Sequence, residues 1–407
     1  MHILVHDFAG YPFPVQLSRA LASRGHKILH VHSAGLQGPK GALSARPEDP
    51  ESFGIRAVPL ARSFRKYSFH RRALAHYRYA SDLMDVIAAE KPDVVISGDT
   101  PIDVQMRLQG FCRSKNVVFV HWIQDIYSKA VGFVLRQRFG PLGELAAGPF
   151  RWMEASVARN SDAVVVIASA FRDLLAGVGV PPTRMTVIEN WGPLEEIPVA
   201  NRDNPWRSEV GLRDRLTFLY SGTLGLKHRP DLIYKLASSL GRKADVVVVS
   251  EGVGRDYLSS LPPLDNLRLL DFQPYARVPE TLASADVLLG TLETDAGDFA
   301  VPSKILAYLC AGRPIVLAAP QMNLSAEVVR RAQAGFTVDT TDENAWLNAA
   351  HALAGDPGMR AAMGRRARAY AEQAFDIRSI AGTFERVIAQ ALPAAVSIGT
   401  PAFNLSQ

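Results

Sequence analysis

The chain has few cysteines and no long apolar segment, and both features limit what it can be. Its 407 residues include only two cysteines, Cys112 and Cys310, which excludes a disulfide scaffold and a four-cysteine zinc site. No apolar run approaches the ~18 residues that a transmembrane helix requires. The first residues, MHILVHDF, lack the basic segment and apolar core of a signal peptide. We therefore expect a cytoplasmic location.

An excess of charge is also missing. The 45 basic and 40 acidic residues leave a net charge of only +5. With 48% apolar and 21% charged residues, the composition is that of a globular protein, not of a disordered or fibrous chain. At roughly 100–200 residues per domain, the length indicates two or three domains.

Acidic side chains are absent from residues 53–81, where seven basic residues alternate with aromatic ones. The basic residues are Arg56, Arg62, Arg65, Lys66, Arg71, Arg72 and Arg78. Such a segment suits an anionic membrane surface or a nucleic acid; a solvated helix face is the alternative. Because no nucleic-acid reading motif accompanies the charge, we expect no nucleic-acid partner.

Short β-branched runs alternate with helical patterns in the first half of the chain. Nearly continuous apolar runs predict buried parallel strands over residues 3–6, 27–32, 94–97, 117–121, 163–168 and 185–189. Helical patterns separate them over residues 15–24, 73–90, 101–115 and 171–176. Strand–helix alternation of this kind predicts a parallel sheet covered by helices on both faces.

The pattern restarts after residues 192–205, which are rich in proline, asparagine and charge and are interpreted as a linker. Strands are predicted over residues 217–221, 245–250, 267–271, 287–290, 315–318 and 335–339. Helices are predicted over residues 230–240, 278–285, 303–311, 326–333 and 344–354, with a further helical tail over 359–392. The chain therefore has two doubly wound domains, and ligands of such sheets bind beyond the carboxyl ends of the strands.

One helix start in the second half combines several features of an anion site. Val301, Pro302, Ser303 and Lys304 open the helix predicted over residues 303–311. Proline and serine suit a helix start, and a helix N-terminus offers unpaired N–H groups at the positive end of its dipole. With the charge of Lys304 the group fits a diphosphate; an ordinary capped helix with a surface lysine is the alternative.

A second candidate follows the strand predicted over residues 217–221. Gly222 allows close approach of a phosphate to the backbone, and Lys227 and Arg229 carry charge that would neutralise it. The spacing matches neither G-x-x-x-x-G-K-[ST] nor G-x-G-x-x-G. The loop alone therefore does not identify a nucleotide site.

Polar residues also follow strands in the first half. His121, Gln124 and Asp125 lie at the carboxyl end of a predicted strand, where they can position a ligand or transfer a proton; a structural role for His121 is the alternative. Gly10 follows the first strand in a loop that we expect to be flexible and to close over a second substrate. No spacing of histidines and carboxylates nominates a metal site, and we expect none.

Four segments occur in an order that resembles a known family: HWIQDIYSKAVG, TVIENWGPLEEI, LYSGTLGLKHRPDLI and VPSKILAYLCAGRPIVLA. This order is similar to bacterial glycosyltransferases of family 4, and nearest to the colanic-acid and O-antigen type. The resemblance spans the whole chain. It implies an α/β architecture of the GT-B type, in which two doubly wound, Rossmann-like domains face each other across a cleft.

The family's organisation implies three parts. An acceptor-side domain is expected over residues 1–195 and a nucleotide-sugar-binding domain over residues 206–375. Residues 376–407 are expected to form a helix that packs back on the first domain, followed by a frayed tail. We expect a hinge near residues 192–205, so that closure on the donor would exclude water.

The resemblance also implies site residues. Positions that match the donor-binding side of the family are Gly222, Thr223 and Lys227 beside the phosphates, Gln273, Pro274 and Tyr275 at the nucleobase, and Ser303 and Lys304 beneath the diphosphate. Gln124 and Asp125 stand where many members carry a His-Asp pair at the sugar. Phe299 and Ala307 replace a pair of glutamates found in many members, which leaves the sugar and ribose contacts unassigned.

The implied activity is transfer of a sugar, with retention and without metal or cofactor, from a nucleotide-sugar donor that we expect to be a UDP-sugar. The acceptor is a polyprenyl-linked or saccharide group in bacterial exopolysaccharide, O-antigen or capsule synthesis. Lys227 and Lys304 are expected to stabilise the leaving diphosphate. A sugar-nucleotide 2-epimerase of the same fold and a non-catalytic homologue that binds nucleotide sugars are the alternatives.

A lipid-linked acceptor requires contact with the inner face of the cytoplasmic membrane, so we expect peripheral attachment there. The acid-free residues 53–81 and a second basic, apolar segment over residues 133–139 are the predicted anchors. Binding to anionic vesicles is expected, with little binding to neutral ones. Changing Arg65, Lys66, Arg71 and Arg72 to Glu is expected to weaken binding to anionic vesicles.

Overall fold

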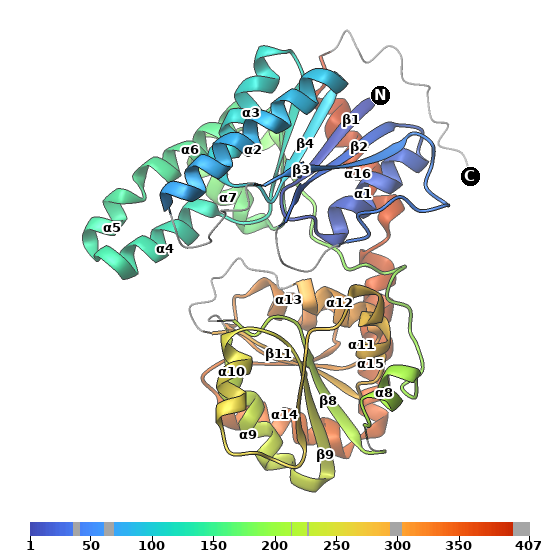
Figure 1. Ribbon diagram of the computed structural model, residues 1–407. Coiled ribbons are helices and arrows are strands. Elements are labelled where there is room, and N and C mark those ends of the chain that lie inside the picture. The colour runs from blue at the N-terminus through green and yellow to red at the C-terminus, as the bar shows by residue number, and fades with distance from the viewer. Residues whose placement is uncertain (36–40, 61–68, 213, 226–227, 294–302, 394–407) are drawn as a thin grey trace. The chain divides into compact units, whose positions relative to one another are not determined.

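The structure is a computed structural model in which the chain forms two compact units, each built on one parallel sheet (Figure 1). It describes residues 1–35, 41–60, 69–212, 214–225, 228–293 and 303–393; of residues 69–71, 137 and 303 it describes the backbone alone. The first unit combines Met1–Glu189 with Ile377–Gln407, and the second is Asn190–Asp376.

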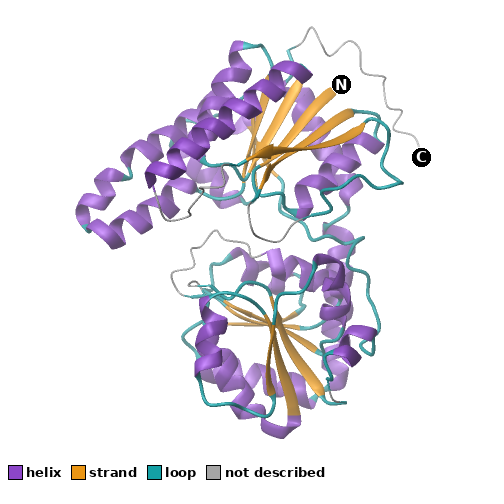
Figure 2. Ribbon diagram, in the orientation of Figure 1, coloured by secondary structure: helices purple, strands orange, loops and turns teal. Residues whose placement is uncertain are grey.

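The first unit contains a seven-stranded sheet in the order β3-β2-β1-β4-β5-β6-β7. Its strands are β1 (His2–Asp7), β2 (Lys27–Ala34), β3 (Phe53–Pro59), β4 (Val94–Gly98), β5 (Val118–Ile123), β6 (Ala163–Val166) and β7 (Met185–Val187). Every residue of β4, β5 and β6 is buried. These apolar strands need cover on both faces, and helices lie on both sides of the sheet (Figure 2).

Strand β3 was not predicted from the sequence. It comes from the acid-free residues 53–81 and forms the edge of the sheet beside β2. An edge strand tolerates polar residues and proline, which hides it from a search for continuous apolar runs. Its Arg56 Nη2 lies 2.7 Å from Glu90 Oε1 on the surface. The basic segment is therefore divided between a strand and a helix and does not form one helix face.

Helices surround the first sheet. They are α1 (Pro12–Ser23), α2 (Phe69–Glu90), α3 (Ile102–Ser114), α4 (Tyr127–Phe139), α5 (Pro141–Ala146), α6 (Gly148–Asn160), α7 (Ser169–Gly177) and α16 (Ile377–Ala391), with a short 3-10 helix, η1 (Pro182–Arg184). The sequence analysis assigned no helix between residues 125 and 160. In this segment α4, α5 and α6 pack on one another and expose many apolar side chains. Their apolar residues are therefore not confined to one face, and the sequence shows no clear amphipathic pattern.

The last helix, α16, belongs to the first unit although it follows the second in the chain. Its Glu385 carboxylate accepts hydrogen bonds from Arg24 Nη2 (2.7 Å) and His26 Nε2 (3.0 Å) at the end of α1. Its Phe384 ring meets the Trp122 ring of β5 edge-on, with centroids 5.0 Å apart. Both aromatic side chains are fully buried, so α16 completes one side of the first unit's core.

The second unit contains a six-stranded parallel sheet in the order β10-β9-β8-β11-β12-β13. Its strands are β8 (Leu216–Ser221), β9 (Ala244–Val249), β10 (Leu267–Leu270), β11 (Val287–Thr291), β12 (Ile315–Ala318) and β13 (Gly335–Val338). Each of these strands was predicted, because each is an apolar run flanked by turn residues. The expected α/β architecture of two Rossmann-like parallel sheets is thus confirmed.

Helices also cover the second sheet. They are α8 (Pro205–Glu209), α9 (Pro230–Leu240), α10 (Val253–Ser260), α11 (Val278–Ala283), α12 (Ser303–Ala311), α13 (Leu324–Arg331), α14 (Glu343–Gly355) and α15 (Pro357–Ala374), with 3-10 helices η2 (Gly241–Lys243) and η3 (Tyr275–Arg277). The core joins α9 and α14 to the sheet through residues such as Leu236, Val246 and Trp346. It fixes the strand ends from which the candidate site is built.

The linker predicted over residues 192–205 is attached to the second unit. Arg313 Nη2 donates to the carbonyl of Ala200 (3.0 Å), and Arg368 Nη1 donates to that of Ile197 (3.0 Å). A Cβ on Gly192 would lie 2.6 Å from Cys310 Sγ of α12, so the segment lies against that helix. The chain divides into its two units at residues 189–190 and 376–377, and a hinge near residues 192–205 stays a prediction.

Candidate active site

The strand order of the second sheet reverses between β8 and β11, and ligands of open α/β sheets bind at such a switch point. Gly222 follows β8 with φ +133°, a conformation that side chains other than glycine rarely adopt. A Cβ at this position would lie 3.2 Å from Cε and 3.4 Å from Nζ of Lys304. The glycine therefore leaves room for the lysine of the neighbouring helix α12.

The Lys304 ammonium is held by neutral groups. It donates to the Tyr220 hydroxyl and lies 3.4 Å both from the carbonyl oxygen of Thr223 and from Nε2 of His228. It also lies 4.1 Å from the centre of the Tyr220 ring. The other nitrogen of His228, Nδ1, accepts the N–H of Gly225 (3.0 Å). Burial lowers the pKa of Lys304 to about 7.

Within the described residues, Lys304 has no carboxylate at salt-bridge distance. Burial also raises the pKa of the Tyr220 hydroxyl well above its usual value, so this neighbour stays neutral. A buried cation without a countercharge is costly, and an anion bound beside it would remove that cost. Lys304 lies at the start of α12, where backbone N–H groups add to the attraction.

Arg229 has a different environment from the one predicted. Its Nε and Nη2 donate to the two carboxylate oxygens of Asp231 (2.8 and 2.6 Å), and its Nη1 donates to the carbonyl of Thr340 (2.8 Å). The charge is thus paired within the protein, and a phosphate contact of Arg229 stays a prediction. The predicted residues Lys227, Val301 and Pro302 lie outside the described residues, and Ser303 is described only as the first residue of α12.

The predicted nucleobase loop lies after β10. Gln273 Oε1 accepts the indole N–H of Trp206 in α8 (3.0 Å), and Gln273 Nε2 donates to the carbonyl of Asp271 (2.9 Å). Gln273 therefore uses its amide to hold the loop against α8. Pro274 is exposed and precedes η3, which begins with Tyr275. A nucleobase contact at Pro274 and Tyr275 stays a prediction.

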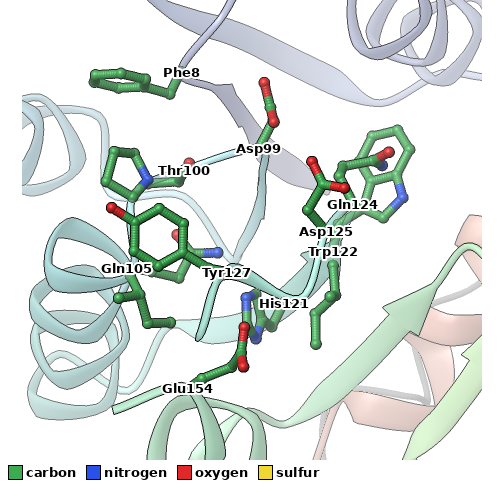
Figure 3. Close-up of a pocket in the computed structure, with 13 residues that line it drawn as sticks. Phe8, Asp99, Thr100, Gln105, His121, Trp122, Gln124, Asp125, Tyr127 and Glu154 are labelled. Atoms are coloured by element: carbon green, nitrogen blue, oxygen red, sulfur yellow. The ribbon is translucent and has the colours of Figure 1, made fainter. Parts of the chain in front are cut away.

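In the first unit, the strand order reverses between β1 and β4, and a pocket of about 310 Å³ lies at the carboxyl ends of β4 and β5 (Figure 3). It is lined by Phe8, Asp99, Thr100, Pro101, Ile102, Gln105, His121, Trp122, Ile123, Gln124, Asp125, Tyr127 and Glu154. The structure thus brings together the predicted residues His121, Gln124 and Asp125. Gly10 does not line this pocket.

Carboxyl groups follow three adjacent strands of this sheet: Asp7 ends β1, Asp99 follows β4 and Asp125 follows β5. Burial, together with the charges of Asp7 and Asp125, raises the pKa of Asp99 well above its usual value. This rise favours the neutral, protonated form of Asp99. Asp99 also has φ +45°, a left-handed conformation that Asp and Asn tolerate better than most residues.

His121 is buried, and burial lowers its pKa to about 3, so its ring is neutral at physiological pH. Its Nδ1 atom is buried without a hydrogen-bond partner among the described residues. Glu154 of α6 accepts a hydrogen bond from Ser128 Oγ (2.5 Å), and burial raises the pKa of its carboxyl group. Beneath the pocket, Ser97 Oγ donates to Gln105 Oε1 (2.7 Å).

Hydrogen bonds flank the loop at Gly10. The carboxylate of Asp7 accepts the N–H groups of Ala9 (3.1 Å) and Tyr11 (2.6 Å). The carbonyl of Gly10 accepts the N–H of Gly41 (3.0 Å). These hydrogen bonds flank Gly10 on both sides, and closure of the loop over a second substrate stays a prediction.

Five polar residues of this pocket were not predicted from the sequence: Asp99, Thr100, Gln105, Tyr127 and Glu154. Asp99 was detectable, because it follows a predicted strand as directly as Asp125 does. Glu154 was not, because it comes from a helix that the sequence does not mark. No group of three or more His, Cys, Asp or Glu side chains in the described parts of the chain is arranged to hold a metal ion.

Comparison with known families places both units. The family model for the glycosyl transferase 4-like domain matches residues 13–191, and the model for glycosyl transferases group 1 matches residues 203–370. Together they span most of the chain. No curated protein is similar enough in sequence to count as a match.

Solved structures share the fold at low sequence identity. HepE from Anabaena, solved in complex with UDP-glucose, is 15% identical (TM-score 0.66; 95% of this chain and 99% of that chain). Sucrose-phosphate synthase from Thermosynechococcus elongatus is 15% identical (TM-score 0.69; 96% and 98%). A putative UDP-N-acetylglucosamine 2-epimerase from Listeria monocytogenes is 13% identical (TM-score 0.61; 95% and 95%). At these identities the likeness concerns the fold alone.

Proposed function

Because this chain belongs to the glycosyltransferases of the GT-B fold, we propose that it transfers a hexosyl or N-acetylhexosaminyl group, with retention, from a UDP-sugar to a lipid-linked or saccharide acceptor. The donor binds to the second unit and the acceptor to the first, in the synthesis of a bacterial surface polysaccharide. The observation that carries this proposal is the Lys304 ammonium, which lies beside Gly222 without a carboxylate partner among the described residues.

Lys304 has a direct part in this chemistry. When the bond between the anomeric carbon and the diphosphate breaks, negative charge grows on the leaving diphosphate. A cation already positioned there stabilises the transition state more than the ground state. The N–H groups at the start of α12 act in the same direction. Lys227 is the predicted second cation.

Turnover of UDP-sugars tests the proposal. We expect Lys304→Ala and Lys227→Ala each to lower kcat by ~100-fold or more, as loss of one such contact commonly does. Lys235→Ala is the matched control, because the Lys235 ammonium is exposed and pairs with Glu343. Unchanged rates in Lys304→Ala would remove this residue from the mechanism.

The reaction products distinguish the proposal from its alternatives. NMR of the product reports whether the anomeric configuration is retained. An epimerised nucleotide sugar would identify a 2-epimerase. Binding of UDP-sugar without any turnover, with a panel of saccharide and lipid-linked acceptors present, would identify a non-catalytic homologue.

The structure also changes where a membrane anchor is expected. Of the four residues predicted to bind lipid, Arg65 and Lys66 lie outside the described residues, as does the side chain of Arg71, and Arg72 lies 3.5 Å from the Tyr127 hydroxyl. Tyr79, in the same segment, is buried and bonded to His6. No described helix has both the length and the apolar character needed to span a membrane.

We propose that helices α4, α5 and α6, the helical arm, which include the anchor predicted over residues 133–139, attach the protein to a bilayer. The arm exposes large apolar side chains: Phe133, Val134, Phe139, Leu142, Leu145 and Trp152. Arg136, Arg138 and Arg159 are exposed among them, and the exposed Glu144 is paired with Arg151. Apolar side chains that enter the interface, with basic ones beside them, suit an anionic lipid surface.

Vesicle sedimentation tests the arm. We expect the protein to pellet with vesicles containing phosphatidylglycerol, and the double variant Leu142→Asn with Leu145→Asn to lose most of this binding, because these side chains are 71% and 75% exposed. Met322→Gln is the control, since Met322 is 79% exposed but lies in the second unit. Equal pelleting of the double variant and the control would contradict the arm as anchor.

A further inference from the structure

The ionisable side chains of the first unit's pocket are mainly acidic. Asp99, Asp125 and Glu154 line it, whereas none of the described residues that line it is a lysine or an arginine. The second unit's site has the opposite character, because Lys304 is its central charge. Arg72 does not line the pocket, but its Nη2 lies 3.5 Å from the hydroxyl of the lining residue Tyr127. A phosphate or carboxylate entering the pocket would lose water and meet mainly negative or neutral groups, which is unfavourable.

The rest of the lining suits a ring that carries hydroxyl groups. Phe8 and Tyr127 offer aromatic surface on one side of the pocket, and Asp99 and Asp125 enter from neighbouring strand ends (Figure 3). Gln105 and Thr100 add polar groups without charge. Apolar walls with a few fixed polar groups are the usual means of orienting a small polar ligand.

His121 gives an independent sign that a ligand belongs there. Its side chain is 94% buried and lines the pocket, and its Nδ1 has no hydrogen-bond partner among the described residues. A buried polar atom without a partner is rare in a folded protein and calls for an explanation. Because the ring is neutral, it can pair with a hydroxyl group but offers no charge to an anion.

We propose that this pocket binds a neutral, hydroxyl-rich ring of the acceptor, a saccharide or cyclic polyol, and discriminates against phosphorylated and acidic groups. The proposal rests on the proposed function, and it narrows the acceptor class: the group that enters the pocket is a sugar already on the acceptor, not a lipid phosphate. Asp99 and Asp125 act as acceptor-binding residues.

The two carboxyl groups have complementary tasks. Burial and the charges of Asp7 and Asp125 raise the pKa of Asp99 and so favour its protonated form, which can donate a hydrogen bond to a hydroxyl oxygen. Asp125, when ionised, accepts a hydrogen bond from a hydroxyl proton. A sugar hydroxyl is both donor and acceptor and satisfies both groups. A fully ionised phosphate offers no proton to Asp125.

Ligand-observed NMR on the full chain tests the proposal. The probes are methyl glycosides of glucose, galactose, mannose and N-acetylglucosamine, and their 6-phosphate or uronic-acid counterparts. UDP is added to every sample as a separate reporter of the second unit. We expect at least one neutral glycoside to bind, and its charged counterpart to bind at least about tenfold more weakly, the effect of one charge-assisted hydrogen bond.

Three variants locate the site. Asp99→Asn keeps a residue that tolerates the left-handed backbone, and Asp125→Asn removes the charge at the second position. We expect both variants to weaken binding of the neutral glycoside about tenfold or more. We also expect Asp125→Asn to reduce the difference in affinity between the neutral and the charged probes. Asp82→Asn, at an exposed position on α2, is the matched control and leaves binding unchanged.

Three results overturn the inference: no neutral glycoside binds, the charged probes bind as well as the neutral ones, or the pocket variants behave as Asp82→Asn does. If Asp99→Asn fails to fold, as a melting curve would show, Asp125→Asn carries the same decision. Failure of UDP to bind would count against the proposed function but not against a saccharide pocket, so the two failures are distinguishable.

Discussion

Binding of a nucleotide sugar is expected to take up a proton at Lys304. In the empty protein, burial lowers the pKa of this ammonium to about 7. A diphosphate beside it favours the charged form and raises the pKa again. The sign follows from the direction of these changes: affinity is greatest below pH 7, where Lys304 is already protonated, and falls as the pH rises above 7.

The size of the effect follows from the fraction of protein with Lys304 protonated. With a pKa of about 7 before binding and a value near the ordinary ~10.4 after it, the dissociation constant rises about fivefold from pH 7 to 8 and about 50-fold from pH 7 to 9. Proton uptake per ligand is about 0.1 at pH 6, about 0.5 at pH 7 and about 0.9 at pH 8.

Calorimetry in buffers of different protonation enthalpy measures this uptake directly. A UDP-sugar is the suitable ligand, because its diphosphate is a diester and does not titrate in this range, whereas the terminal phosphate of UDP does. Lys304→Met is the control, since it keeps the apolar stem and removes the ammonium. Affinity independent of pH in the natural protein, or equal uptake in Lys304→Met, would refute the reasoning.

Three further changes test the packing of the two units by chemical denaturation. Gly192→Ala is expected to destabilise the second unit by ~1–3 kcal/mol, because its Cβ would lie 2.6 Å from both Cys310 Sγ and the Leu306 carbonyl oxygen. Gly110→Ala, in the exposed middle of α3 with no atom within 4 Å of the new Cβ, is expected to stabilise by ~0.5–1 kcal/mol; a loss of stability there would contradict the helix. Phe384→Ala is expected to cost ~3–5 kcal/mol, and a cost below ~1 kcal/mol would show that α16 does not close the first core.

Residues that follow a buried parallel strand were the most predictable part of the site. The sequence pointed to Gln124 and Asp125 because the apolar run before them ends abruptly, and to Lys304 because serine and proline mark the start of its helix. The same rule applies to Asp99, which was overlooked. These positions are readable because strand and helix ends are encoded locally.

Features that depend on contacts between residues far apart in the sequence could not be predicted in the same way. The partner of Arg229 is only two residues away, but the hydrogen bond to Thr340 that fixes its direction comes from a remote loop. The neutral state of His121 depends on its burial. Glu154 lies on α6, whose sequence shows no clear helical spacing of apolar residues. Strand β3 escaped because an edge strand does not need a continuous apolar run.

The position of α16 has a consequence for synthesis of the protein on the ribosome. Trp122 of β5 meets Phe384 only after the whole second unit, Asn190–Asp376, has been translated. At about 5–20 residues per second, this interval lasts about 10–40 s. During that time the nascent first unit has an open apolar seam where α16 will pack, while the second unit folds from a continuous stretch of chain. Chaperone binding to stalled nascent chains should therefore be strongest between the emergence of β7 and that of α16.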